Sequence, residues 1–89
     1  MNIEITDRAK EKFQLMKEKN IPITLMKYPV GWAGYKYKIV SAKQTEDDNL
    51  YKVDGFDIIV SKDSEIGLKG VMIDYGGFLF KDFIVYPKF

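Results

Sequence analysis

The sequence predicts an α+β domain that is mainly β, in which one N-terminal helix packs on a small antiparallel or mixed β structure of about six or seven short strands. Two observations lead to this class. Only the stretch from Thr6 to Asn20 repeats its apolar residues at helical spacing, and the later segments alternate or are rich in β-branched and aromatic residues between turn residues. The 89 residues, 1–89, are expected to form a single domain.

The N-terminal segment combines a short strand with the helix. Residues 2–5, NIEI, alternate polar and apolar side chains, which is typical of a strand. Thr6 is expected to cap the helix that follows, and Asp7 suits its first turn, near the positive end of the helix dipole. The apolar stripe of the helix comprises Ala9, Phe13 and Met16, widened by Leu15. The opposite face carries Lys and Glu and is expected to face water.

The middle of the chain is expected to form four strands. IPITLMKY contains Pro22, which marks a strand start or an edge. YKYKIV alternates, with Tyr35, Tyr37 and Ile39 on one face and two lysines on the other. After the polar connection AKQTEDDN, the segments LYKV and FDIIV flank Asp54-Gly55, a strong hairpin signal.

The C-terminal part is expected to contain a short helical segment and two further strands. SKDSEIGLKG favours one or two helical turns that begin at Asp63 or Ser64 and end at Gly70. VMIDY and FLFKDFIVYP are expected to be strands around the Gly76-Gly77 turn.

The charge balance argues against two classes of partner. The 14 basic and 13 acidic residues nearly cancel, so no global field directs the chain to nucleic acid or to a membrane surface, and we expect neither partner. A net charge of +1 leaves room for self-association as a homodimer. The start MNIEITDRAK lacks the apolar run of a signal peptide, and no segment approaches the length of a membrane span. A cytoplasmic location is therefore expected.

Cysteine and histidine are both absent, which restricts the chemistry further. The chain has no thiolate nucleophile, no imidazole base and no His/Cys metal site. Iron–sulfur clusters are normally held by thiolates, so we expect the chain alone to hold none. Asp74 and Asp82 lie in separate strand segments, and nothing in the sequence indicates that they converge as an acid–base pair. We expect no catalytic residues, no metal ligands, no cofactor and no enzymatic activity.

The order of elements and several local strings resemble the HesB/IscA-like family of A-type iron–sulfur carriers and scaffolds. IEITDRAKEKFQLM corresponds to the family's opening strand and helix, and GWAGYKY to its glycine–cysteine–small–glycine turn before an aromatic strand. FIVYPKF corresponds to an Asn-Pro-Asn-like exit. The resemblance is strongest from Val53 to Tyr75, where Asp74 matches an aspartate that the family carries in a strand. The resemblance covers nearly the whole chain and implies a HesB-like domain, with a role in the fold for Asp74.

The departures from the family concern its metal ligands. In the family, one cysteine lies in the glycine turn and two more lie in a Cys-Gly-Cys-like tail, and together they bind iron or an iron–sulfur cluster, often across a dimer. Here Trp32 occupies the first position, and the sequence ends at Phe89, just beyond Pro87, where the tail would follow. The resemblance therefore implies a degenerate member, and no metal-binding residue carries over to this chain.

The glycine turn is the candidate interaction site, comprising Gly31, Trp32, Gly34, Tyr35 and Tyr37. The preferred interpretation of Trp32 is that its indole folds back onto the sheet, because buried aromatic side chains are the commoner case. The second is an exposed anchor for a partner. YKYK could also stack on nucleic-acid bases, but the balanced charge favours an amphipathic strand with tyrosines inside and lysines in water. The acidic run Glu46–Asp48 lacks calcium-loop spacing and is expected to be a solvated turn.

Two functions follow from these observations. The first is a non-catalytic HesB/IscA-like protein associated with iron–sulfur cluster biosynthesis, which binds no cluster itself and acts through contacts with assembly proteins. The second is a re-purposed HesB-like domain, unrelated to iron–sulfur chemistry, that binds a peptide or a small apolar ligand around Trp32, Tyr35 and Tyr37. A pocket lined by these three side chains would favour the second function.

Overall fold

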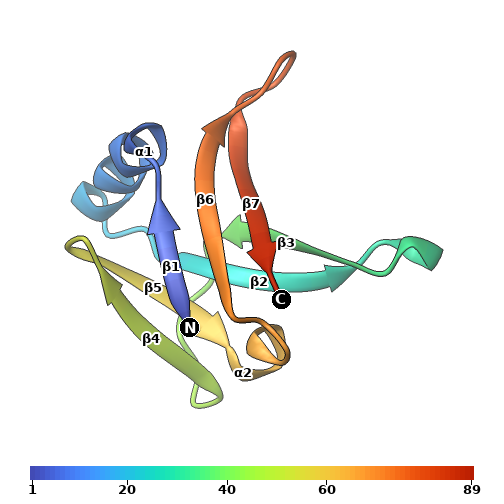
Figure 1. Cartoon of the computed structure of the whole chain (residues 1–89). Helices are drawn as coiled ribbons and strands as arrows, with labels where there is room; N and C mark the ends of the chain where they lie inside the picture. Colours follow the sequence, from blue (N-terminus) through green and yellow to red (C-terminus); the bar gives the residue numbers. More distant parts are fainter.

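A computed structural model describes residues 1–89 and confirms the predicted class, with one main helix and seven strands in two sheets (Figure 1). In chain order the elements are β1 (Asn2–Ile5), α1 (Asp7–Glu18), β2 (Ile23–Pro29), η1 (Gly31–Ala33), β3 (Tyr35–Val40), β4 (Asp48–Val53), β5 (Phe56–Ser61), α2 (Lys62–Glu65), β6 (Gly70–Gly76) and β7 (Asp82–Lys88). No helix of the chain is long and apolar enough to cross a bilayer.

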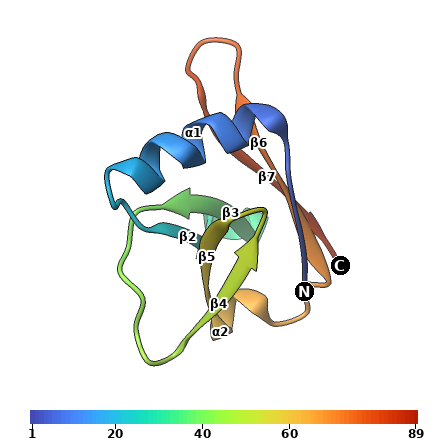
Figure 2. The ribbon, with the colours of Figure 1, turned by 90° about the vertical axis from the view of Figure 1, so that its left-hand side faces the viewer.

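The strands form one sheet of three and one of four. In the first, of order β1-β6-β7, β1 runs parallel to β6, and β6 and β7 form a hairpin. In the second, of order β3-β2-β5-β4, the hairpins β2–β3 and β4–β5 are joined by parallel pairing of β2 with β5. The strands of the two sheets run crosswise in Figure 1, and α1 lies across β6 and β7 in Figure 2. Both sheets are therefore mixed.

The core is centred on a phenylalanine of α1 that touches both sheets. Phe13 is fully buried, and its ring centroid lies 5.7 Å from that of Phe56 in β5 and 4.9 Å from that of Phe83 in β7. The other completely buried large side chains come from β2, β5 and β6: Leu25, Ile58, Val60, Val71 and Ile73. One aromatic side chain thus joins the helix, the three-stranded sheet and the four-stranded sheet.

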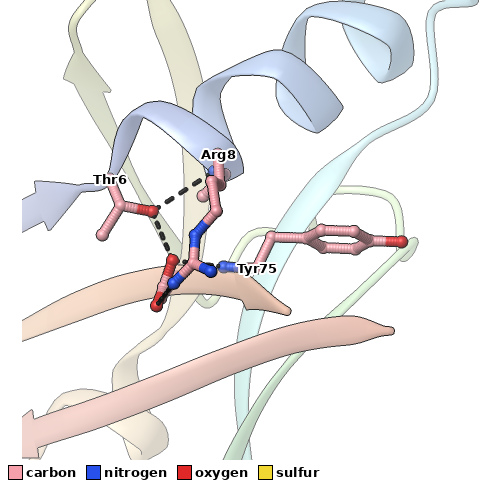
Figure 3. Close-up of polar contacts among 5 residues, drawn as sticks. Thr6, Arg8 and Tyr75 are labelled. Atoms are coloured by element: carbon pink, nitrogen blue, oxygen red, sulfur yellow. Dashed lines mark hydrogen bonds and ion pairs between the residues drawn. The ribbon is translucent and has the colours of Figure 1, made fainter. Parts of the chain in front are cut away.

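The start of α1 is fastened to β6 by a carboxylate. Thr6 caps the helix as predicted, because its hydroxyl accepts a hydrogen bond from the backbone N–H of Ala9. The same hydroxyl donates to Asp74 at 2.7 Å, and the Arg8 guanidinium lies 2.7 Å from the other carboxylate oxygen (Figure 3). Hydrogen bonds from Thr6, then from the backbone N–H of Tyr75, and then Arg8 hold the pKa of Asp74 below its usual value. Asp74 therefore performs the structural role that the resemblance implied.

Three local expectations were wrong. Leu15 is 48% exposed, so the buried stripe of α1 is narrower than predicted. The second helix begins at Lys62, because the Ser61 hydroxyl accepts from the N–H of Ser64, and it ends at Glu65 rather than at Gly70. The last strand begins at Asp82, because Gly76 already pairs with Asp82 and the intervening residues form the hairpin loop.

The two ends of the chain lie at one end of the three-stranded sheet. Asn2 of β1 and Lys88 of β7 are both paired with Gly70, the first residue of β6. A Cβ on Gly70 would lie 2.6 Å from the Asn2 carbonyl oxygen, so glycine permits this close approach. The β6–β7 turn lies at the opposite end of the sheet (Figure 1).

Removing the cap of α1 should destabilise the fold measurably. In Thr6→Ala, the loss of one helix cap should lower the free energy of unfolding by about 1–2 kcal/mol, and thereby lower Tm by about 4–8 °C per kcal/mol. Thr6→Ser keeps the hydroxyl and should stay near the wild type. Thermal unfolding followed by circular dichroism measures both, and an unchanged Tm in Thr6→Ala would contradict the role of the cap.

The Asp74 carboxylate should make stability depend on pH in a defined direction. Because its pKa is lowered in the folded chain, its contribution is complete above the unfolded value and is lost as pH falls through the folded pKa. The Tm difference between the wild type and Asp74→Asn should therefore be largest near neutral pH and shrink at about pH 2. A difference that stays constant on acidification would show that the charge of Asp74 has no such role.

Candidate docking site

The candidate site lies on a hairpin that continues past the sheet that supports it. β2 pairs with β5 only from Ile23 to Leu25, whereas β2 and β3 stay paired as far as Pro29 and Tyr35. Residues 26–38, here called the β2–β3 arm, therefore extend away from β5, as Figure 1 shows. The predicted glycine turn forms the tip of this arm.

Two glycines shape the tip around the single tryptophan. Gly31 and Gly34 have φ values of 58° and 95°, which favour glycine, and the backbone N–H of Val30 donates to the Gly34 carbonyl at 2.9 Å. Trp32 lies in the 3-10 turn between them and is 100% exposed. The preferred interpretation, an indole folded back onto the sheet, is therefore wrong. The arm extends too far for any other element to lie beneath the indole.

The two tyrosines of the site have different environments. Tyr37 is buried at 8% exposure, with its ring centroid 6.3 Å from that of Phe89. Tyr35 is 64% exposed, and the Lys27 ammonium lies 4.7 Å from the centre of its ring. The expectation that both tyrosines face inward therefore holds only for Tyr37. Tyr35 pairs with Pro29 at the end of the β2–β3 ladder, next to the turn.

The arm concentrates positive charge that the total composition conceals. It carries Lys27, Lys36 and Lys38 and no carboxylate, while the other residues comprise 11 basic and 13 acidic side chains (14 less 3 basic, and all 13 acidic). The three ion pairs of the chain all lie elsewhere. Lys38 lies 5.0 Å from the centre of the Tyr28 ring, and its interaction with the Tyr28 phenol raises the pKa of Lys38. Positive charge and exposed aromatic rings therefore occur together on the arm.

The donor groups of the arm do not fit an iron–sulfur cluster. The tip offers an indole, a phenol and ammonium groups, none of which replaces a thiolate as a cluster ligand. No group of three or more His, Cys, Asp or Glu side chains in the chain lies together as a metal site. Asp74 and Asp82 also remain apart in the β6–β7 register, where Asp74 pairs with Ile84 and Asp82 with Gly76.

The main hollows of the surface lie away from the arm. One, of about 310 Å³, lies where the end of α1 meets the β4–β5 hairpin, with Lys17, Ile21 and Phe56 in its lining. The other, of about 370 Å³, lies between the start of α1 and the β6–β7 turn. Neither is lined by Trp32, Tyr35 or Tyr37. An enclosed ligand site built from these three side chains is therefore not supported.

Sequence reasoning missed a second group of exposed side chains. Phe78, Leu79 and Phe80 are 100%, 80% and 86% exposed in the β6–β7 turn, although they were expected to belong to the last strand. The turn was predicted at Gly76-Gly77, but the pairing of Gly76 with Asp82 extends the loop over residues 77–81.

Comparisons with known proteins agree with the fold. The family model described as iron-sulphur cluster biosynthesis matches residues 1–82. Escherichia coli SufA, involved in biosynthesis of iron-sulfur clusters, superposes with a TM-score of 0.77 at 21% identity, over 96% of this chain and 79% of that chain. IscA with a 2Fe–2S cluster gives a TM-score of 0.74 at 16% identity, over 96% and 84%. A protein from Aquifex aeolicus gives 0.64 at 22% identity, over 94% and 89%. No curated protein matches the chain.

The opposite exposures of Trp32 and Tyr37 should separate their effects on stability. Trp32→Ala removes a fully exposed side chain and should change the free energy of unfolding by less than about 0.5 kcal/mol. Tyr37→Ala removes a buried ring and should cost about 3 kcal/mol or more. Urea unfolding of both variants tests this difference. A comparable loss in Trp32→Ala would mean that the indole packs against the chain after all.

Proposed function

Because this chain belongs to the iron-sulphur cluster biosynthesis family, we propose that it acts beside cluster assembly as a non-catalytic docking protein that holds no cluster itself. One observation carries the proposal. Trp32, which by the family resemblance stands where relatives carry a cysteine, has a fully exposed indole at the tip of a projecting arm. The turn thus presents an aromatic side chain that can anchor a partner.

An exposed indole is suited to anchoring a protein contact. A tryptophan buries about 150–250 Å² when it is covered, and at about 25 cal/mol per Å² this contributes about 4–6 kcal/mol before the costs of association. Tryptophan is enriched among the residues that dominate binding energy in interfaces. The paired strands and the glycine turn already hold Trp32 in place, so little backbone freedom is lost on binding.

The proposed partners are cysteine-bearing assembly proteins, which would supply the thiolates that this chain lacks. The arm presents Lys36, Lys38 and the Lys27–Tyr35 pair beside the anchor, so carboxylates on the partner would add to the contact. A homodimer and a cytoplasmic location complete the proposal.

The re-purposed domain remains the second candidate function. The exposed rings of Trp32 and Tyr35 favour it, since both could hold a peptide. The burial of Tyr37 against Phe89 counts against it, because only two of the three expected side chains are accessible.

Affinity capture from native cytosol tests the docking role. Immobilised wild type should retain cysteine-bearing cluster-assembly proteins, identified by mass spectrometry, and Trp32→Ala should lose at least about tenfold of that capture, as expected of a central anchor. Phe78→Ala is the matched control, because it removes an equally exposed ring from the other hairpin tip.

The other outcomes are also informative. Capture that survives Trp32→Ala keeps the docking role and moves its site away from the arm. If the wild type captures no cluster-assembly protein and the eluate contains no iron, the re-purposed domain is favoured. Iron binding or cluster formation by the purified chain without a partner contradicts the proposal.

A further inference from the structure

The turn of the β6–β7 hairpin presents three adjacent apolar side chains to solvent. The last strand pair is Gly76 with Asp82, and residues 77–81, here called the tip loop, project beyond α1 (Figures 1 and 2). Phe78, Leu79 and Phe80 are almost fully exposed there. A phenyl ring buries about 150–250 Å² when covered, so the tip displays on the order of 500 Å² of apolar surface. The largest apolar patch on a typical monomer covers about 300–600 Å² and is often functional, so the tip is a candidate contact surface.

The backbone of the tip loop holds these side chains outward. Gly77 has a φ of 145°, and a Cβ at this position would overlap the Phe80 carbonyl oxygen. The loop therefore turns back on itself in a way that only glycine permits. No hydrophobic residue of the core packs against the three side chains. The exposed patch thus follows from a closed turn at the end of a long hairpin.

A cationic hollow lies directly behind the tip loop. Its volume is about 370 Å³, and it is lined by Arg8, Glu11, Lys12, Tyr75, Gly76, Gly77 and Lys81. Arg8 is already paired with Asp74. Lys12 lies over the Tyr75 ring at 5.1 Å, and neither Lys12 nor Lys81 makes an ion pair. Two free ammonium groups therefore face a single lining carboxylate, that of Glu11.

We propose that the tip loop inserts into an anionic lipid surface, with its apolar side chains among the acyl chains and Lys12 and Lys81 against the headgroup phosphates. The order of the groups along the hairpin, apolar at the front and cationic behind, matches the order of a bilayer from acyl chains to headgroups. A convex tip needs no preformed pocket in a fluid bilayer, whereas a protein partner would have to supply one. The near-neutral net charge of the chain argued against a membrane partner, but the residues that line the hollow have a local excess of positive charge.

Each part of this surface has an expected share in the binding. Insertion of one phenyl ring should change vesicle partition about tenfold. One lysine near an anionic surface should contribute about fivefold. Only the lysine share should weaken with salt, because added ions screen charges and not apolar contacts. Binding through one such tip should be reversible, as it is for a single acyl chain.

Vesicle flotation tests the inference directly. The probes are phosphatidylcholine vesicles with and without phosphatidylglycerol, and the proteins are the wild type, Phe78→Ser/Phe80→Ser, Lys12→Gln/Lys81→Gln and Trp32→Ala. The wild type should float with the phosphatidylglycerol vesicles. The affinity for these vesicles should fall about a hundredfold in the phenylalanine variant and about twenty-fivefold in the lysine variant. Trp32→Ala should float like the wild type, because Trp32 lies on the other hairpin. Circular dichroism and Tm confirm that each variant is folded.

Several results would overturn the inference. The tip loop has no role in membrane binding if the wild type fails to float with the phosphatidylglycerol vesicles, or if the phenylalanine variant floats equally well. Equal flotation with both kinds of vesicle overturns the anionic headgroup assignment. The wild type could instead bind no vesicles and show a mass in light scattering that rises with concentration. If the phenylalanine variant loses that rise, the tip loop contacts a second copy of the chain. Because Trp32→Ala and the tip variants affect different assays, failure here leaves the docking proposal standing.

Discussion

The position of Phe13 between two sheets is the contact on which the rest of the structure depends. Its ring meets Phe56 from the four-stranded sheet and Phe83 from the three-stranded sheet, so a single helix supplies the core that both sheets share. A chain of 89 residues can bury only a modest core. Its strands extend past the region that α1 can cover, and two hairpins therefore end in solvent. The exposed aromatic and apolar side chains of functional interest lie on those ends.

The two hairpin ends have different chemistry although they belong to one small domain. The β2–β3 arm combines an exposed indole with three lysines and no carboxylate, which suits a specific contact with a protein surface. The β6–β7 tip presents Phe78, Leu79 and Phe80 in front of a cationic hollow. A net charge of +1 conceals the charge of the arm, because the arm itself carries no carboxylate, and it conceals the smaller positive excess of the hollow, where Glu11 faces Lys12 and Lys81. Local charge is therefore more informative here than the total.

Much of the fold could be predicted from local sequence patterns, whereas the features that depend on long-range strand pairing could not. Thr6 as helix cap and Asp54-Gly55 as hairpin turn follow from interactions within a few residues, and both are present. Trp32 was misjudged because its exposure depends on β2 and β5 parting after Leu25, a pairing limit that no local pattern encodes. The apolar residues 78–80 looked like strand because their composition is typical of one, whereas the register that joins Gly76 to Asp82 leaves them in the turn. The sequence could single out the glycine turn around Trp32, but the exposure of its side chains required the tertiary structure.

The meeting of both chain ends beside Gly70 has a consequence for how the domain can be connected. Asn2 and Lys88 flank one residue of β6, so their backbones are separated by about two strand spacings, or roughly 10 Å. A short linker could join them, and the chain could be reopened at the exposed Asp54-Gly55 turn to give a circular permutant of the same fold. The domain could equally be spliced as an insert into a surface loop of another protein. The β6–β7 turn, at the opposite end of the three-stranded sheet, would then point away from the host.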